Sequence, residues 1–137
     1  MVTGIAHICI LSRDLAATEK FYVEILGMRK KFDFLRSGQR IGFYLEVGAN
    51  QFIEVFQKSD REIPHSSAIT HFCLQVNDIQ AVSHHLHKHQ IDHQAPKLGA
   101  DQSWQVWCND PDGIAIELHQ YTALSSQFTG KDCQVNW

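Results

Sequence analysis

The stretch that decides the fold is IAHICILSRD, residues 5–14, because ITHFCLQVND, residues 69–78, repeats its pattern of residue types. Both segments begin with Ile, carry His at the third position and Cys at the fifth, and end in Asp. His7 and His71 are therefore 64 positions apart, and the Cys and Asp pairs share that offset. Self-similarity at one fixed spacing indicates an internal duplication.

The duplication reaches the far end of each half, where Glu54 and Glu117 are 63 positions apart. The spacing of apolar residues predicts the order strand, helix, strand, strand, strand in each half. Asp14 and Asp78 are expected to cap the two helices, and Gly27 is expected to end the first. The expected strands cover residues 5–11, 28–35, 40–47 and 51–57 in the first half and 69–76, 93–98, 103–108 and 114–119 in the second, with helices at about 14–27 and 78–90.

This order predicts an α+β fold in one domain that covers residues 1–137 and is built from two βαβββ modules. The first module is expected at about residues 3–57 and the second at about residues 68–120. The polar segment 58–67 is expected to link them. Residues 121–137 remain as a C-terminal tail.

The bulk composition argues against several classes of protein. The formal net charge is −3 and the Lys and Arg residues are dispersed, whereas a nucleic-acid surface needs a concentrated basic patch. No apolar run approaches the roughly 20 residues of a membrane-spanning helix, and we expect no signal peptide and no membrane partner. The 4 cysteines show no CxxC spacing, which favours reduced thiols and a cytoplasmic protein.

Each half places one His in its first expected strand and one Glu in its last. Glu54 shares a strand face with Phe52 and Phe56, where a buried carboxylate must be neutralised, paired or bound to a metal. The duplication allows two His and two Glu side chains to converge on one divalent transition metal, with positions left open for water or substrate. The expected ligands are His7, Glu54, His71 and Glu117.

Each of these residues also has an ordinary structural explanation. A lone His in a strand usually serves packing, and a Glu in a strand often faces solvent at a sheet edge. Only the paired placement across the repeat favours a metal site. We expect Cys9 and Cys73 to pack in the core. The His-rich run at residues 84–89 is expected on a solvated helix face, although His85 and His89 are spaced to bind a metal adventitiously.

Four segments carry a resemblance to a known family. They are DLAATEKFYVEILG at 14–27, which follows His7, FIEVF at 52–56, THFCLQVND at 70–78 and NDPDGIAIELH at 109–119. With them the chain resembles, over about residues 4–121, the vicinal oxygen chelate superfamily of glyoxalase I, extradiol dioxygenases, methylmalonyl-CoA epimerase and fosfomycin-modifying enzymes. The resemblance implies a glyoxalase-like fold, in which the two modules form an open, mixed-sheet barrel around one metal, usually in a homodimer.

Position 54 decides which member the resemblance favours. Dioxygenases and fosfomycin enzymes of this superfamily typically have metal ligands that correspond to His7, His71 and Glu117, and no ligand at the fourth place. A glutamate at that place, such as Glu54, is similar to the ligand set of glyoxalase I. The resemblance then implies a lactoylglutathione lyase that binds nickel, cobalt or zinc and moves a proton next to a carbonyl of a hemithioacetal. The metal would act as a Lewis acid, with Glu117 as the base and Glu54 as its partner.

Two departures leave the small-molecule substrate and the activity open. Glutathione-using relatives often have Arg and Asn where this chain has Leu11 and Lys58, so the thiol of a thiol adduct is not fixed. The first alternative is an iron-dependent extradiol dioxygenase or a thiol transferase on the same fold, in which Glu54 is not a ligand. The second is a metal-free drug-binding protein of the bleomycin-resistance type, with a cleft lined by aromatic residues such as Phe52 and Phe56.

Overall fold

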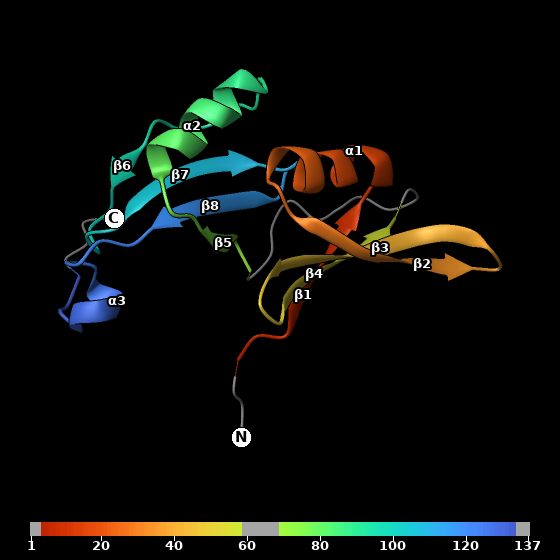
Figure 1. Cartoon of the computed structure of the whole chain (residues 1–137), viewed down its shortest axis with the longest axis horizontal. Coiled ribbons are helices and arrows are strands. Elements are labelled where there is room, and N and C mark those ends of the chain that lie inside the picture. Colours follow the sequence, from red (N-terminus) through yellow and green to blue (C-terminus); the bar gives the residue numbers. More distant parts are fainter. Residues whose placement is uncertain (1–3, 59–68, 134–137) are drawn as a thin grey trace. The chain divides into compact units, whose positions relative to one another are not determined.

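Two compact units, Met1–His65 and Ser66–Trp137, make up the chain in the computed structural model (Figure 1). The structure describes residues 4–58 and 69–133. The expected linker, apart from Lys58, therefore lies outside the described residues. Each unit contains one four-stranded mixed sheet that is not closed on itself, together with few helices, which confirms the predicted α+β class.

The first unit has the predicted βαβββ order, with the middle strands β4 and β3 flanked by β1 and β2. The neighbours β1 and β4 run parallel, and the two remaining pairs run antiparallel. This topology places the first and last strands of the module side by side. The elements are β1 (His7–Ser12), α1 (Leu15–Glu19), η1 (Lys20–Ile25), β2 (Arg29–Arg36), β3 (Gln39–Gly48) and β4 (Gln51–Gln57).

The helical segment of this unit begins where the sequence predicts. The Asp14 carboxylate accepts hydrogen bonds from the backbone N–H groups of Ala16 and Ala17 at 2.9 and 3.2 Å, which satisfies two donors of the first turn. Gly27 ends the segment with a left-handed φ of +73°. The change from α1 to the π-helical η1 was not predicted, because the apolar spacing of one helical turn does not distinguish the two.

Alternation along β4 separates the core from the exposed face of the first sheet. Ile53 and Val55 are buried with Phe43 of β3, while Glu54 points to the opposite face and is only half-buried. Because helix α1 contacts β4 and contributes buried side chains, the core lies between helix and sheet. Glu54 therefore lies on the face of the sheet opposite α1.

The second unit repeats this topology, with the strand order β5, β8, β7, β6 and a parallel pair of β5 and β8. Asp78 caps its helix through hydrogen bonds from Gln80 and Ala81, both 3.0 Å long. The strand expected at residues 93–98 is reduced to β6 and an isolated bridge between His93 and Cys108. The elements are β5 (Phe72–Gln75), α2 (Ile79–Lys88), β6 (Lys97–Leu98), β7 (Trp104–Asn109), β8 (Ala115–Gln120) and α3 (Ser126–Thr129).

The described part of the C-terminal tail folds back on the second unit. Ser125 and Ser103 are fully buried, and their hydroxyl groups lie 2.7 Å apart. Gln127 of α3 donates a hydrogen bond to the Asp101 carboxylate at 2.7 Å. The tail thereby fixes the loop that carries Asp101. Among the described helices, none combines the length and the apolar character that crossing a bilayer requires.

Candidate metal centre

The first half of the predicted site lies on the exposed face of the first sheet. The parallel register places Cys9 opposite Glu54 and His7 opposite Phe52. His7 Nε2 lies 3.9 Å from Glu54 Oε2, and the Glu54 side chain is 21% exposed. Because β4 is a middle strand, Glu54 does not protect a sheet edge.

The second half of the site repeats this arrangement in the second unit. His71 Nε2 lies 3.6 Å from Glu117 Oε2, and the Glu117 side chain is 13% exposed. Its strand, β8, also lies between two neighbours. Trp107 faces Glu117 in the register and packs edge-on against the His71 ring, at 4.7 Å between ring centroids.

The donor atoms of both pairs suit a divalent metal ion. Metal–nitrogen and metal–oxygen bonds of roughly 2.0–2.2 Å place two adjacent donor atoms about 3 Å apart. The His7–Glu54 and His71–Glu117 distances of 3.9 and 3.6 Å are therefore slightly longer than a shared ion needs. Neutral imidazole and carboxylate together fit zinc, nickel or cobalt. Each unit thus holds one imidazole and one carboxylate that could serve as metal ligands.

Both cysteines beside these pairs differ from the prediction. Cys9 and Cys73 were expected in the core, but both are exposed on the same sheet face as the adjacent His. The strand period of two explains this, because each Cys follows its His by two residues. Desolvation and the neighbouring Glu54 raise the pKa of Cys9 to about 11, and desolvation and Glu117 raise that of Cys73 to about 12. Both thiols are therefore neutral hydrogen-bond donors at pH 7.

Two residues beside Glu117 were not among the predicted site residues. His119 is buried, and its Nδ1 lies 3.1 Å from Glu117 Oε1 while its Nε2 lies 3.6 Å from Asp101 Oδ2. Cys73, Glu117 and His119 bring donor atoms within 4.8 Å of one another. The spacing of His119 from Glu117 would have sufficed to find it, since residues i and i+2 of a strand share a face. Asp101 lies in a loop, where no period applies.

Aromatic rings lie on the sheet face of the first unit that carries Glu54, and Tyr44 is paired with Glu54 in the register of β3 and β4. The Tyr44 ring stacks on Phe32 and on Phe52, with centroids 4.9 and 5.2 Å apart, and it faces the His7 ring edge-on at 6.0 Å. The exposed Phe32 extends this surface to β2. Such a face can bind an apolar part of a ligand next to the polar pair.

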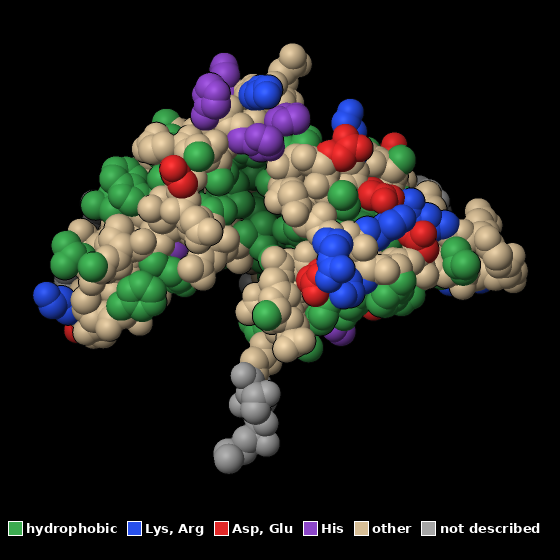
Figure 2. Space-filling view, viewed as in Figure 1, with side chains coloured by type: hydrophobic (Ala, Val, Ile, Leu, Met, Phe, Trp, Pro, Cys, Tyr) green, Lys and Arg blue, Asp and Glu red, His purple; other side chains and the backbone are tan. Residues whose placement is uncertain are grey.

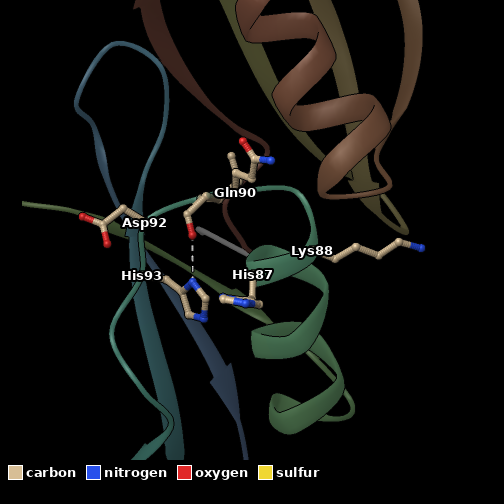
Figure 3. A pocket seen from close by; sticks show the side chains of 6 residues that line it. His87, Lys88, Gln90, Asp92 and His93 are labelled. Atoms are coloured by element: carbon tan, nitrogen blue, oxygen red, sulfur yellow. Dashed lines mark hydrogen bonds between the residues drawn. The ribbon is translucent and has the colours of Figure 1, made fainter.

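The His-rich run is separate from both His–Glu pairs. Its His side chains are exposed along and just after α2, where purple His side chains gather in Figure 2, and the His85 and His89 rings lie 4.5 Å apart. A surface pocket lies at the end of this helix. His93 lines it, and the Nδ1 of His93 forms a hydrogen bond of 2.8 Å with the Ile91 carbonyl oxygen (Figure 3). None of the four predicted metal ligands lines it. The lining residues are His87, Lys88, Gln90, Ile91, Asp92 and His93.

Comparisons with known proteins match this architecture over nearly the whole chain. The family model of the Glyoxalase/Bleomycin resistance protein/Dioxygenase superfamily matches residues 4–118. The metallothiol transferase FosB of Staphylococcus epidermidis is 32% identical over 126 residues, which cover 88% of this chain and 84% of FosB. The uncharacterized protein YaeR of Escherichia coli is 27% identical over 122 residues, covering 83% and 93% of the two chains. A lactoylglutathione lyase structure from Agrobacterium tumefaciens shares the fold, with a TM-score of 0.66 at 19% identity over 87% of this chain and 94% of that one.

Proposed function

The chain belongs to the Glyoxalase/Bleomycin resistance protein/Dioxygenase superfamily, and we propose that it is a metal-dependent enzyme of the glyoxalase I type. In this proposal His7, Glu54, His71 and Glu117 hold one divalent ion: nickel, cobalt or zinc. The reaction is a proton transfer next to the carbonyl of a small-molecule thiol adduct, as in a lactoylglutathione lyase. We further propose a cytoplasmic homodimer.

The position of Glu54 is the observation that carries this proposal. It lies on a middle strand, beside His7 and away from the helix-covered core, just as Glu117 lies beside His71. A carboxylate that is mostly shielded from water and has no Lys or Arg partner among the described residues needs another source of positive charge. A fourth protein ligand supports the lyase over activities that use two His and one Glu.

In the proposed reaction each side chain of the site has its own role. A bound divalent ion supplies a Lewis acid that polarises the substrate carbonyl. Glu117 would remove the proton and Glu54 would assist its return to the neighbouring carbon, since each carboxylate lies beside a His on a middle strand of its own unit. The thiols of Cys9 and Cys73 donate hydrogen bonds to these carboxylates and keep them oriented. The aromatic face around Tyr44 shields the substrate from water.

A thiol transferase is the second candidate, because the relative FosB is 32% identical and bears the name metallothiol transferase. In that function His7, His71 and Glu117 suffice as metal ligands, and Glu54 does not bind the metal. Leu11 and Lys58, which replace the Arg and Asn often found in glutathione-using relatives, also weaken the assignment of glutathione. The two candidates therefore differ in what they require of residue 54.

Reconstitution with metal and an activity panel test the proposal. The metal-free protein is loaded separately with Ni²⁺, Co²⁺, Zn²⁺ and Fe²⁺, then assayed with methylglyoxal mixed with glutathione or other low-molecular-weight thiols. We expect isomerisation of at least one hemithioacetal with nickel or cobalt, and its loss in Glu54→Gln. The matched control is Glu46→Gln on the same sheet, which has no part in the site. Transfer of a thiol to an electrophilic drug, retained in Glu54→Gln, would replace the lyase by the transferase.

A further inference from the structure

The two halves of the candidate site differ two residues after each Glu. By the offset of 63 that relates Glu54 to Glu117, position 119 in the second unit corresponds to position 56 in the first. Phe56 packs against the Phe34 ring, with centroids 4.6 Å apart, and offers no hydrogen bond to Glu54. His119 instead places a ring nitrogen beside Glu117. At this equivalent position the first module thus has an apolar side chain and the second module has a polar one.

The His119 ring lies between two carboxylates. Its Nδ1 forms a hydrogen bond of 3.1 Å with Glu117 Oε1. Its Nε2 is buried, has no hydrogen-bond partner among the described residues, and lies 3.6 Å from Asp101 Oδ2. The carboxylate oxygens can only accept when ionised, so the Nδ1 contact requires the proton on Nδ1. The ring therefore donates to Glu117 from Nδ1, and Asp101 attracts its far side when Nε2 also carries a proton, as both ring nitrogens do in the charged form.

Asp101 is itself fixed in place. Its Oδ1 accepts from the Ser103 backbone N–H at 3.2 Å, and its Oδ2 accepts from the Gln127 amide at 2.7 Å. Burial raises the pKa of Asp101, but the hydrogen bonds from Gln127 and Ser103 outweigh this and lower it below the usual value. A charged, anchored carboxylate thus faces the rear of the His119 ring, and the ring of Tyr121 packs on it with centroids 4.8 Å apart.

We propose that His119 is a positioning residue that orients the Glu117 carboxylate, and that Asp101 in turn orients His119. This proposal rests on the proposed function, since it takes Glu117 as a metal ligand and base. Metal ligands in proteins are commonly held by a second group that fixes their orientation. Here the arrangement is present in one module only. Glu117 is therefore the firmly held carboxylate of the site, and Glu54 is the one with fewer constraints.

Cobalt binding to the metal-free protein tests this role without depending on turnover. His119→Phe copies the first module, keeps a ring in the buried space and removes the donor. We expect it to weaken Co²⁺ binding by roughly 10- to 100-fold. His119→Asn keeps an N–H donor at the δ position and is expected to recover most of the affinity. His93→Ala removes a half-buried His of the same unit outside the site and is the matched control, with unchanged affinity.

Kinetics with any substrate the wild type converts give a second readout. His119→Phe is expected to lower kcat by about 10-fold or more with KM changed less than about threefold, because Glu117 and not the substrate pocket is disturbed. If this variant does not fold, Asp101→Asn tests the same chain of contacts from Asp101 through His119 to Glu117. We expect its affinity for Co²⁺ to be about threefold weaker than that of the wild type. Thermal unfolding of every variant identifies those that are folded.

The outcomes separate this inference from the function on which it rests. Wild-type affinity in folded His119→Phe, or in Asp101→Asn if that variant replaces it, would overturn the role of His119 and leave the proposed function standing. Equal weakening in His119→Phe and His119→Asn would also overturn it, because a lost imidazole, rather than a lost donor, would then be responsible. Absence of Co²⁺ binding in the wild type would overturn both.

Discussion

Cys73 lies directly opposite Glu117 across the parallel pair of β5 and β8, and its thiol donates a hydrogen bond to that carboxylate. Cys9 stands in the same relation to Glu54 across β1 and β4. The internal repeat therefore conserves a thiol–carboxylate pair as well as a His–Glu pair. A neutral thiol satisfies a carboxylate oxygen without adding a further negative charge to the site.

The reactivity of Cys73 tests this relationship. Desolvation and Glu117 raise its pKa to about 12, so only a very small fraction is thiolate at pH 8. We expect iodoacetamide to modify Cys73 in the metal-free protein at least about 100-fold more slowly than it modifies glutathione at pH 8. The rate should rise about tenfold per pH unit to beyond pH 10. Peptide mass spectrometry resolves Cys73 from the other cysteines.

A charge-removing variant provides the control for that measurement. Glu117→Gln removes the carboxylate that helps to raise the Cys73 pKa and should therefore speed alkylation of Cys73. The assigned contact would be contradicted by an alkylation rate of Cys73 that levels off below pH 9, or by a rate that is the same in Glu117→Gln as in the wild type.

The close packing of β3 against β4 predicts a large effect at Gly42. A methyl group added there would overlap the Val55 carbonyl oxygen and crowd the Phe56 backbone. We expect Gly42→Ala to lower the free energy of unfolding by roughly 1–3 kcal/mol in urea denaturation. Gly48→Ala on the same strand is the control, since its nearest contact is at 3.6 Å, and it should change stability by less than about 0.5 kcal/mol. Equal stability of the two variants would show that β3 and β4 are not in this register.

Asp101 is expected to make stability depend on acid pH. Its pKa is lowered in the folded protein, so its contribution is fully present above the unfolded-state pKa, near 4, and is lost as the pH falls through the folded-state value. Asp101→Asn should therefore reduce the loss of unfolding free energy between about pH 4 and pH 2. Chemical denaturation at several pH values measures this slope. A wild-type slope in the variant would exclude Asp101 as a contributor.

The His-rich run is expected to play no part in the tightly held metal. His85 and His89 are exposed on α2 and lie outside the His–Glu pairs. The double variant His85→Ala, His89→Ala should keep the wild-type metal content after dialysis, as measured by elemental analysis. It should bind less strongly to a nickel resin, since paired exposed imidazoles bind such ions weakly. A loss of tightly bound metal in this variant would show that the metal binds at α2 and not at the His–Glu pairs.

The repeat carried most of what could be inferred about the fold and the site. The offset of His71 from His7 predicted two βαβββ units, as the structure shows, and the paired placement of His and Glu in the repeat predicted that they converge. Within each unit the structure does place the Glu beside its His. The error over Cys9 and Cys73 came from residue type, because free Cys is usually buried, although the same period placed both beside the His residues.

Other features depend on contacts that no local pattern encodes. Asp101 reaches His119 from a loop, and α3 fixes that loop through Gln127. The π-helical end of the first helix carries the fully buried Tyr22, and the apolar spacing of the sequence is the same for an α-helical turn. Such relationships join residues through the tertiary fold, so periodicity along the chain cannot reveal them.

Metal content of the reconstituted protein and of four single variants tests the central proposal most directly. The variants are His7→Ala, Glu54→Gln, His71→Ala and Glu117→Gln, each loaded with Co²⁺, dialysed and examined by elemental analysis. If one ion joins both modules, the wild type retains about one ion for each pair of modules, and each variant, Glu54→Gln included, loses most of it. About two ions per chain in the wild type, with each variant losing only one, would contradict a shared ion. Full metal content in Glu54→Gln would contradict the fourth ligand.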